Sequence, residues 1–270
     1  MKAARIIEPD KPLELNQVEI SDPTGIQVLI KVLSTGVCHS DLHLWEGGYD
    51  TGDGFMKVTD RGVKFPVTPG HEVVGTIEKI GESVKNVKIG DTVLIYPWIG
   101  CGNCPTCQKG DTNLCETPKS LGVFQDGGYA EKVIVPDYKF LANIGDVNPD
   151  SASSLACSGL TAYTAIKKAL VNNPESILIV GAGGLGLMGV QLASHMTKCN
   201  IICADLADEK LNIAKELGAT HVVNTKENNV SQKIMSLCNE KGVDSIVDFV
   251  NAPPTVKLDL SVIRKRGNII

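Results

Sequence analysis

The segment Ile177-Leu-Ile-Val-Gly181-Ala-Gly183-Gly-Leu-Gly186 joins an apolar run to a glycine-rich loop. The apolar run predicts a buried strand, and sequence with helical character follows from Gly184 to Met196. In such a unit Gly181 permits a tight turn, Gly183 lets the backbone approach a pyrophosphate, and Gly186 allows the helix to pack closely on the strand. The free N–H groups at the helix start would face the phosphates. We interpret this segment as a dinucleotide-binding loop.

An acidic residue follows the loop at the spacing that dinucleotide sites use. Asp205 lies nineteen residues after Gly186, at the end of the second expected strand, Asn200–Ala204. A carboxylate there accepts hydrogen bonds from the adenosine ribose hydroxyls and repels a 2′-phosphate, and Leu206 stands where an NADP site more often has arginine. The sequence therefore predicts NAD as cofactor. The alternative is a glycine-rich contact between helix and strand that binds no ligand.

Strands and helices alternate after Ser151. The expected strands are Ile177–Val180, Asn200–Ala204, His221–Val223, Asp244–Asp248 and Asn268–Ile270, and the helices include Gly184–Met196, Ala207–Leu217 and Val230–Glu240. This alternation predicts an α/β domain with a doubly wound parallel sheet over residues 151–270. The fold uses six strands and only five are found, so we expect an incomplete domain, truncated at the C-terminus.

Residues 1–150 contain short apolar or alternating runs separated by glycine and proline. The runs are Gln27–Val37, Val73–Ile80, Asp91–Trp98 and Tyr129–Pro136. Strands of this length at this spacing predict a compact β-rich domain of barrel type. The glycine-containing segment Tyr49–Lys64 predicts a long loop.

Composition and charge limit the class of protein. With 270 residues, 43% hydrophobic and 21% charged, the chain has the composition of a globular protein with two domains. Its net charge of −5 and the absence of a long basic run argue against nucleic-acid or anionic-membrane partners. The start, MKAARIIEPDK, shows no signal peptide, and the uncharged stretch Ser176–Thr197 is too rich in glycine to favour a membrane span. We expect a soluble, cytoplasmic protein.

Four of the nine cysteines lie within fifteen residues. They are Cys101, Cys104, Cys107 and Cys115. Closed tetrahedral sulfur sites of this kind hold zinc in a structural role, so the spacing predicts a structural zinc. An iron–sulfur cluster uses similar ligands, and four free thiols are a poorer alternative because exposed thiols oxidise.

A second group of metal-ligating residues is scattered. Three of the five histidines fall between residues 39 and 71, in the same half of the chain as the cysteine cluster. A catalytic zinc takes three protein ligands and leaves one position open, and Cys38, His71 and Cys157 can supply two thiolates and one imidazole. Each residue alone is more often packed than ligating. Cys199, Cys203 and Cys238 are expected to pack as small hydrophobic residues.

Together these motifs resemble the zinc-dependent alcohol dehydrogenases of the medium-chain dehydrogenase/reductase family. The matching segments are Gly36–His43, Pro69–Glu72, Cys101–Cys115, Ala156–Ala162 and the glycine loop with Asp205. The resemblance implies a GroES-like catalytic domain over residues 1–150 and a Rossmann domain over residues 151–270. It also implies that Cys38, His71 and Cys157 bind a catalytic zinc, so that each chain holds two zinc ions.

The resemblance further assigns roles to residues around the two sites. Glu72 would lie beside the catalytic metal, and Asp41 would orient the zinc-bound histidine. Lys210 would contact the adenosine ribose and His39 the pyrophosphate. Ser40 would pass the substrate proton, through the nicotinamide ribose, to His43, which reaches solvent; the alternative is that both have ordinary capping and surface roles.

The activity implied is reversible hydride transfer between NAD and a primary or secondary alcohol, with the aldehyde or ketone as product. Zinc lowers the pKa of an oxygen bound to it, which suits removal of the hydroxyl proton. A polyol dehydrogenase of the same fold usually has glutamate at the position of Cys157, and quinone reductases lack the zinc ligands. A folded but inactive zinc- and nucleotide-binding fragment is the other alternative. The full-length form is expected to be a homo-oligomer, a dimer or a tetramer.

Overall fold

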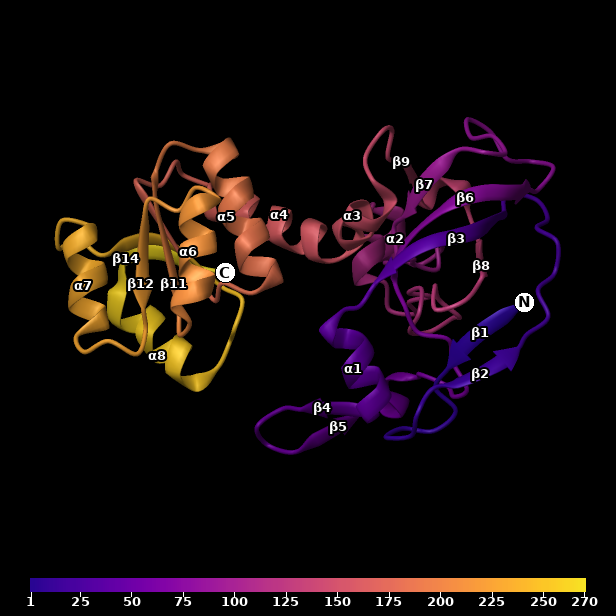
Figure 1. The fold of residues 1–270 in the computed structure, drawn as a ribbon, viewed down its shortest axis with the longest axis horizontal. Helices are drawn as coiled ribbons and strands as arrows, with labels where there is room; N and C mark the ends of the chain where they lie inside the picture. The colour runs from indigo at the N-terminus through magenta and orange to yellow at the C-terminus, as the bar shows by residue number, and fades with distance from the viewer. The chain divides into compact units, whose positions relative to one another are not determined.

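The computed structural model describes residues 1–270, and the chain divides into two compact units. The N-terminal unit is Met1–Cys157 and the C-terminal unit is Ser158–Ile270 (Figure 1). The first is rich in antiparallel strands, and the second alternates parallel strands with helices. The fold class expected from the sequence is therefore confirmed. None of the helices has the length and apolar character needed to span a membrane.

A five-stranded antiparallel sheet forms the centre of the N-terminal unit. Its order is β8-β3-β6-β7-β9, with bounds Lys132–Val135, Val28–Gly36, Glu72–Ile80, Thr92–Ile95 and Leu141–Asn143. Two smaller antiparallel pairs join β1 (Lys2–Arg5) to β2 (Glu14–Gln17) and β4 (Gly48–Asp50) to β5 (Phe55–Lys57). The four sequence-predicted strands of this half correspond to β3, β6, β7 and β8.

Alternation along the strands builds the core of this sheet. Val28 and Ile30 of β3 are fully buried and belong to one hydrophobic cluster with Val93 and Ile95 of β7. Residues two apart in a strand share a face, so each strand contributes every second side chain to this cluster. The residues between them, Leu29 and Leu94, face the other side of the sheet, where Leu29 is also buried.

Short helices connect these strands. They are α1 (His39–Glu46), η1 (Val58–Arg61), α2 (Pro105–Gln108), η2 (Thr112–Leu114), η3 (Tyr138–Phe140), α3 (Pro149–Ala152) and η4 (Ser153–Ala156). The prediction of a long loop over Tyr49–Lys64 was wrong, because the segment contains the β4–β5 hairpin and η1. The pattern missed the hairpin because all three residues of β5 are exposed, so the strand shows no alternation of apolar and polar residues.

The C-terminal unit contains a parallel sheet of order β12-β11-β10-β13-β14. Its strands are β10 (Ser176–Val180), β11 (Asn200–Asp205), β12 (His221–Asn224), β13 (Val243–Asp248) and β14 (Ile263–Ile269). Its helices are α4 (Ser158–Ala169), α5 (Gly184–Met196), α6 (Asp208–Glu216), α7 (Val230–Leu237) and α8 (Pro253–Val262). This order, with the first strand of the unit in the middle, is that of a doubly wound nucleotide-binding sheet.

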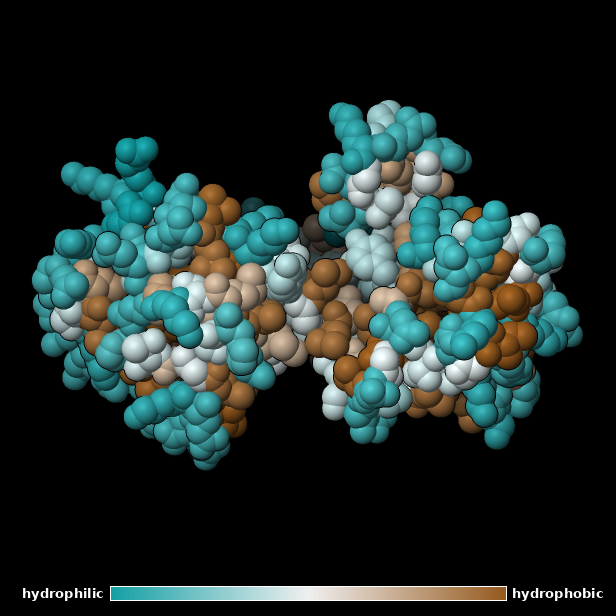
Figure 2. Space-filling view, turned by 90° about the horizontal axis from the view of Figure 1, so that it is seen from above, coloured by the Kyte–Doolittle hydropathy of each residue, from teal (hydrophilic) through white to brown (hydrophobic).

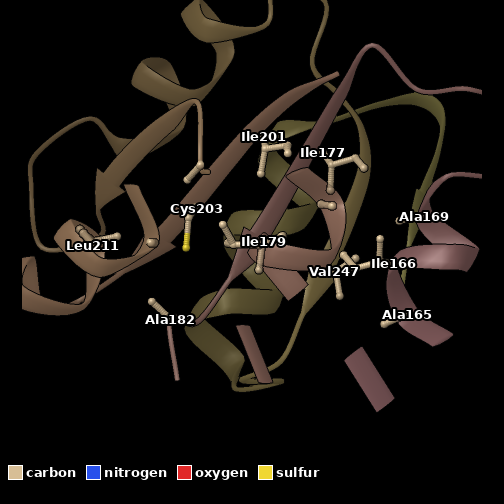
Figure 3. Close-up of a cluster of buried hydrophobic side chains, with 14 residues drawn as sticks. Ala165, Ile166, Ala169, Ile177, Ile179, Ala182, Ile201, Cys203, Leu211 and Val247 are labelled. Carbon is tan, nitrogen blue, oxygen red and sulfur yellow. The ribbon is translucent and has the colours of Figure 1, made fainter. Parts of the chain in front are cut away.

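The two faces of this parallel sheet carry separate hydrophobic clusters. Ile177 and Ile179 of β10 pack with Ile166 of α4 and with residues of α5 and α6, and Figure 3 shows these side chains together with Cys203. Leu178 of β10 faces the opposite cluster, which α7 and α8 cover. Both faces are buried, which explains why the strand is a continuous apolar run.

The expected packing role of the remaining cysteines agrees with their surroundings. Cys203 is fully buried in β11, and burial raises the pKa of its thiol to about 12. Cys238 is buried against the face that α7 and α8 cover, and the half-buried Cys199 packs at the edge of the other cluster.

Two elements of the C-terminal unit differ from the sequence expectation. Strand β14 begins at Ile263, five residues before the expected start, because Ile263 pairs with Val243 ahead of an irregularity in register. No helix was expected at α8, which begins with two prolines. Proline fits the first turn of a helix, where its missing N–H leaves no hydrogen bond unmade.

The surface of both units is mixed in character. Figure 2 shows hydrophobic side chains among hydrophilic ones over the visible face, with the larger apolar areas on the N-terminal unit. Exposed apolar residues of that unit include Val37, Leu42, Phe55 and Leu114. Single apolar side chains at a surface are ordinary.

Candidate metal and cofactor sites

The four clustered cysteines meet in space. One sulfur from each of Cys101, Cys104, Cys107 and Cys115 lies within 4.8 Å of the others. Helix α2 makes this possible, because Cys104 is its N-cap and Pro105 occupies its first position. Gly100 leaves room for the cluster, since a Cβ at this position would lie 2.6 Å from the Cys107 Sγ.

Backbone N–H groups point at these sulfurs. The N–H groups of Cys104 and Cys107 donate to the Sγ atoms of Cys101 and Cys104, each at 3.4 Å, and the Cys101 N–H donates to Cys115 Sγ at 3.3 Å. The Asn103 N–H, with further donors, lowers the pKa of Cys101 to about 6. Such donors lower the pKa of Cys101 and Cys115, while burial raises the pKa of Cys107 to about 12. Four sulfurs this close together fit a tetrahedral zinc site.

A second cluster lies in the same unit. Ligand atoms of Cys38, His71, Glu72 and Cys157 lie within 4.8 Å of one another. Cys38 precedes α1, His71 and Glu72 lie at the start of β6, and Cys157 follows η4. The structure therefore brings together the three ligands predicted from the sequence and the glutamate expected beside them.

Burial and electrostatics in this second cluster suit a metal ion. His71 is 1% exposed and neither Nδ1 nor Nε2 has a hydrogen-bond partner, which is a costly arrangement for buried polar atoms. A hydrogen bond with Cys157, aided by His71, lowers the pKa of Cys38 to about 3 against the effect of burial. Burial opposes charge on His71 as well, but Asp41 and Cys38 raise its pKa to about 9. A cation bound here would give Nε2 a partner and balance the thiolate.

Asp41 connects the parts of this cluster. It is 6% exposed, and its carboxylate accepts hydrogen bonds from the N–H groups of Cys38 and Gly70 at 2.9 and 3.1 Å. Its Oδ1 lies 3.4 Å from His71 Nδ1, on the side of the ring opposite Nε2. Burial alone would raise the pKa of Asp41, but His71 and the two N–H donors lower it overall. The carboxylate is therefore placed to orient the imidazole.

Tyr129 is a residue that the sequence interpretation missed. Its hydroxyl donates to Asp41 Oδ2 at 3.2 Å, and burial together with the Asp41 charge raises its pKa. The sequence signal was limited to its position after Gly127-Gly128, which marks a turn. Asp41 lies 88 positions from Tyr129 in the chain, so no local sequence pattern indicates the hydrogen bond between them.

Gly36 explains how the glutamate fits beside the cysteine. A Cβ at Gly36 would lie 1.9 Å from Glu72 Oε2, so any other residue would displace the Glu72 carboxylate. Gly36 and Glu72 are paired across β3 and β6. The glycine in the motif Gly36–His43 therefore serves close approach rather than a turn.

A cavity of about 470 Å³ in the N-terminal unit contains His71 and Ser40 in its lining, together with Trp98. Ser40 is in the first turn of α1, and His43 is one turn further on. The His43 ring lies 4.7 Å from the rings of His39 and Tyr49 and is partly exposed. Ser40 thus lies beside the metal-ligand cluster and His43 towards solvent, with no hydrogen bond between them.

The three glycines of the loop have the backbone conformation and the close surroundings that the sequence predicts for them. Gly181 has φ +90°, a Cβ at Gly186 would lie 1.7 Å from the Gly181 carbonyl oxygen, and Gly183 has open space around it. Helix α5 begins at Gly184. Asp205 Oδ2 accepts a hydrogen bond from the Ala182 N–H at 2.7 Å, which ties the loop to the end of β11.

A cavity of about 350 Å³ adjoins this loop. Its lining includes Gly181, Asp205, Leu206 and Val250, and Asp205 is its one ionisable residue. Lys210 is exposed on α6 and is not part of the lining. His39 lies in the other unit. The cavity is largely apolar with a carboxylate at its edge, which suits an adenosine group with free ribose hydroxyls.

Comparison with known proteins identifies the family. Residues 24–146 match the alcohol dehydrogenase GroES-like domain, and residues 184–270 match the zinc-binding dehydrogenase domain. An NAD-dependent alcohol dehydrogenase of Saccharolobus solfataricus is 41% identical over 271 residues, which cover 100% of this chain and 77% of that protein. An L-threonine 3-dehydrogenase of Pyrococcus furiosus is 30% identical, covering 100% and 74%. The crystal structure of an alcohol dehydrogenase from Aeropyrum pernix has a TM-score of 0.86 at 33% identity, covering 100% and 77%.

This chain belongs to the zinc-containing medium-chain alcohol dehydrogenase family. It is an oxidoreductase that acts on CH–OH groups with a nicotinamide dinucleotide, and its relatives differ in substrate. The family resemblance expected from the sequence is confirmed.

Proposed function

We propose that the chain is a zinc- and NAD-dependent dehydrogenase of primary or secondary alcohols, which also reduces the corresponding aldehydes and ketones. The observation that carries this proposal is the cluster of Cys38, His71, Glu72 and Cys157, whose ligand atoms lie within 4.8 Å of one another. Ser40 and the buried His71 both line the neighbouring cavity, so a hydroxyl compound there would meet the cluster.

Cys38, His71 and Cys157 would hold the catalytic zinc, with Glu72 beside it. Zinc supplies a Lewis acid that lowers the pKa of a substrate hydroxyl. Asp41 Oδ1 lies 3.4 Å from His71 Nδ1 and would orient the ring, which leaves Nε2 as the ligating nitrogen. Cys101, Cys104, Cys107 and Cys115 would hold the second, structural zinc.

Ser40 and His43 would transfer the proton. Ser40 Oγ would accept the hydroxyl proton of the substrate and pass it, by way of the nicotinamide ribose, to the partly exposed His43, which would release it to solvent. Glu46 Oε2 lies 3.2 Å from His43 Nδ1. NAD would supply the hydride acceptor, and the protein would only position it against the substrate.

The C-terminal unit would bind NAD through Gly181, Gly183, Gly186 and Asp205. The absence of a cationic side chain in the adjoining cavity favours NAD over NADP, because a 2′-phosphate there would meet the Asp205 carboxylate. Lys210 and His39 are assigned to the ribose and the pyrophosphate. Residues 1–150 would form the catalytic domain and residues 151–270 the NAD-binding domain.

The test is oxidation of ethanol and benzyl alcohol with NAD and with NADP by protein loaded with zinc. We expect NAD to be the preferred cofactor by at least tenfold in kcat/KM. The Cys157→Ala variant should lose turnover, while Cys199→Ala, which changes a half-buried thiol outside both clusters, should keep it. Equal turnover of Cys157→Ala and the unaltered protein would contradict the proposal.

A further inference from the structure

The cavity beside the metal-ligand cluster contains one permanent charge. Its lining residues are mainly apolar or neutral, and no aspartate or glutamate is among them. Arg61 is the only lysine or arginine in the lining. A volume of about 470 Å³ suits a small organic molecule. An anionic ligand would therefore meet an attractive charge there and no carboxylate.

The backbone that carries Arg61 is held firmly. Arg61 ends η1, which is followed by Gly62 at φ +92°. Val58 and Val63, on either side of it, are 3% and 5% exposed and belong to the same hydrophobic cluster. The Val63 N–H donates to the Val58 carbonyl at 3.2 Å, which closes the turn. Arg61 therefore sits on a packed turn at the edge of the cavity and not on a loose loop.

The guanidinium of Arg61 has no partner within the protein. Arg5 pairs with Asp126 at 3.6 Å, and Arg264 pairs with Asp244. Arg61 forms neither a salt bridge nor a side-chain hydrogen bond, although Asp60 adjoins it in sequence. Its five N–H donors are free for a ligand, and a guanidinium binds a carboxylate or a phosphate through two parallel hydrogen bonds.

We propose that the substrate of this chain is an alcohol that carries an anionic group, a carboxylate or a phosphate, which pairs with Arg61 in this cavity. The inference rests on the proposed alcohol dehydrogenase function. Oxidation transfers a hydride from the carbinol carbon to NAD and releases the hydroxyl proton, while the anionic group is unchanged. His71 and Arg61 line the same cavity, so one molecule can present its hydroxyl to the cluster and its anion to the guanidinium.

Steady-state kinetics with matched alcohols test this assignment. The probes are 4-hydroxybutyrate and 3-hydroxypropyl phosphate as the two anions and 1,4-butanediol as the neutral counterpart. For the unaltered protein we expect kcat/KM to be at least tenfold higher for one of the anions, and which one it is separates a carboxylate substrate from a phosphate. The Arg61→Gln variant should reduce this preference at least tenfold, mainly through KM, and Arg61→Lys should retain part of it. Lys64→Gln removes a nearby exposed charge that does not line the cavity and should keep the full preference.

A binding measurement separates this inference from the proposed function. The measurement is tryptophan fluorescence. The chain has two tryptophans, Trp45 and Trp98, and Trp98 lines the cavity, so the Trp45→Phe variant has a single fluorophore, which lies at the proposed binding site. If no alcohol is oxidised, the proposed function fails. The anionic alcohols could still bind and quench the fluorescence of Trp98, and an affinity at least tenfold weaker in Arg61→Gln would then support the assignment of Arg61. Equal kcat/KM for the anions and the diol, or an unchanged ratio in Arg61→Gln, would overturn it.

Discussion

The sulfur atoms of Cys38 and Cys157 lie 3.9 Å apart although 119 positions separate them in the chain. Cys38 follows β3, and Cys157 follows η4, which contacts both β3 and β6. The second metal-ligand cluster is therefore a product of the folded N-terminal unit. The four-cysteine cluster, by contrast, lies within one short segment that can wrap an ion locally.

Asp41 is expected to control how well His71 holds a metal. In Asp41→Asn the amide offers one acceptor oxygen where the carboxylate offers two, so the donors Cys38 N–H, Gly70 N–H and Tyr129 hydroxyl cannot all be satisfied. We expect zinc at this cluster to be released to a chelator ~10–100-fold more readily, with a parallel fall in kcat. Chelator competition followed by metal analysis measures this. Asp22→Asn, at an exposed ion pair with Lys79, is the control, and equal retention in Asp41→Asn would contradict the role.

Two glycines of the dinucleotide loop are expected to respond differently to alanine. A Cβ at Gly186 would lie 1.7 Å from the Gly181 carbonyl oxygen, so Gly186→Ala should displace α5 from β10 and lower the thermal stability of the C-terminal unit. A Cβ at Gly183 meets nothing within 4 Å, and Gly183 has φ −80°, which alanine accepts. Gly183→Ala should therefore keep its melting temperature.

NADH titration completes this comparison. Gly183→Ala should lose NADH affinity at least tenfold, because the methyl group occupies the space that a pyrophosphate would need. A variant of Gly183 that binds NADH normally would show that the phosphates do not approach this glycine. Differential scanning calorimetry measures the melting temperatures of both variants.

Asp259 is expected to make the stability of the C-terminal unit depend on pH. The residue is 1% exposed and its Oδ1 has no partner, and burial together with the neighbouring Asp248 raises its pKa to about 7 from the ordinary value of 3.8. A raised pKa of a carboxyl group means that the folded state binds the proton more tightly than the unfolded state. Stability therefore falls as pH rises from about 4 to about 7, and the loss is complete above that range.

The Asp259→Asn variant removes this titration. Relative to the unaltered protein it should gain stability as pH rises from 4 to 8, by on the order of 1–3 kcal/mol at pH 8. Thermal unfolding at pH 5 and pH 8 measures the difference. Glu209→Gln, at an exposed position of α6, should show no such trend. A gain for Asp259→Asn that is the same at both pH values would refute the assignment.

The parallel sheet could be predicted well because its signals are local. The run Ile177–Val180 is apolar on both faces, and Gly181 marks the turn, so β10 and α5 follow from adjacent residues. The β4–β5 hairpin could not be predicted, because its strands are short and the residues of its second strand are all exposed. Helix α8 was missed because two prolines in succession suggest a break as readily as a helix start.

The site was predicted only in part, for a related reason. Cys38, His71 and Cys157 are individually ambiguous, and their combination was assigned through the family motifs. Tyr129 and Arg61 belong to no motif, since Tyr129 is linked to the site by a hydrogen bond to the distant Asp41 and Arg61 is part of a cavity wall. Such contacts join residues that are far apart in the chain, and spacing along the chain does not encode them.

Metal stoichiometry tests the central claim most directly. The unaltered protein, Cys157→Ala and Cys104→Ser should be purified alike and analysed for zinc and iron by mass spectrometry. We expect two zinc ions per chain in the unaltered protein and one in Cys157→Ala, with alcohol oxidation lost, since Cys104 and its three partners would still hold the other ion. Cys104→Ser should lose the structural ion and unfold at a lower temperature. A single zinc in the unaltered protein, retained in Cys157→Ala, would contradict the account.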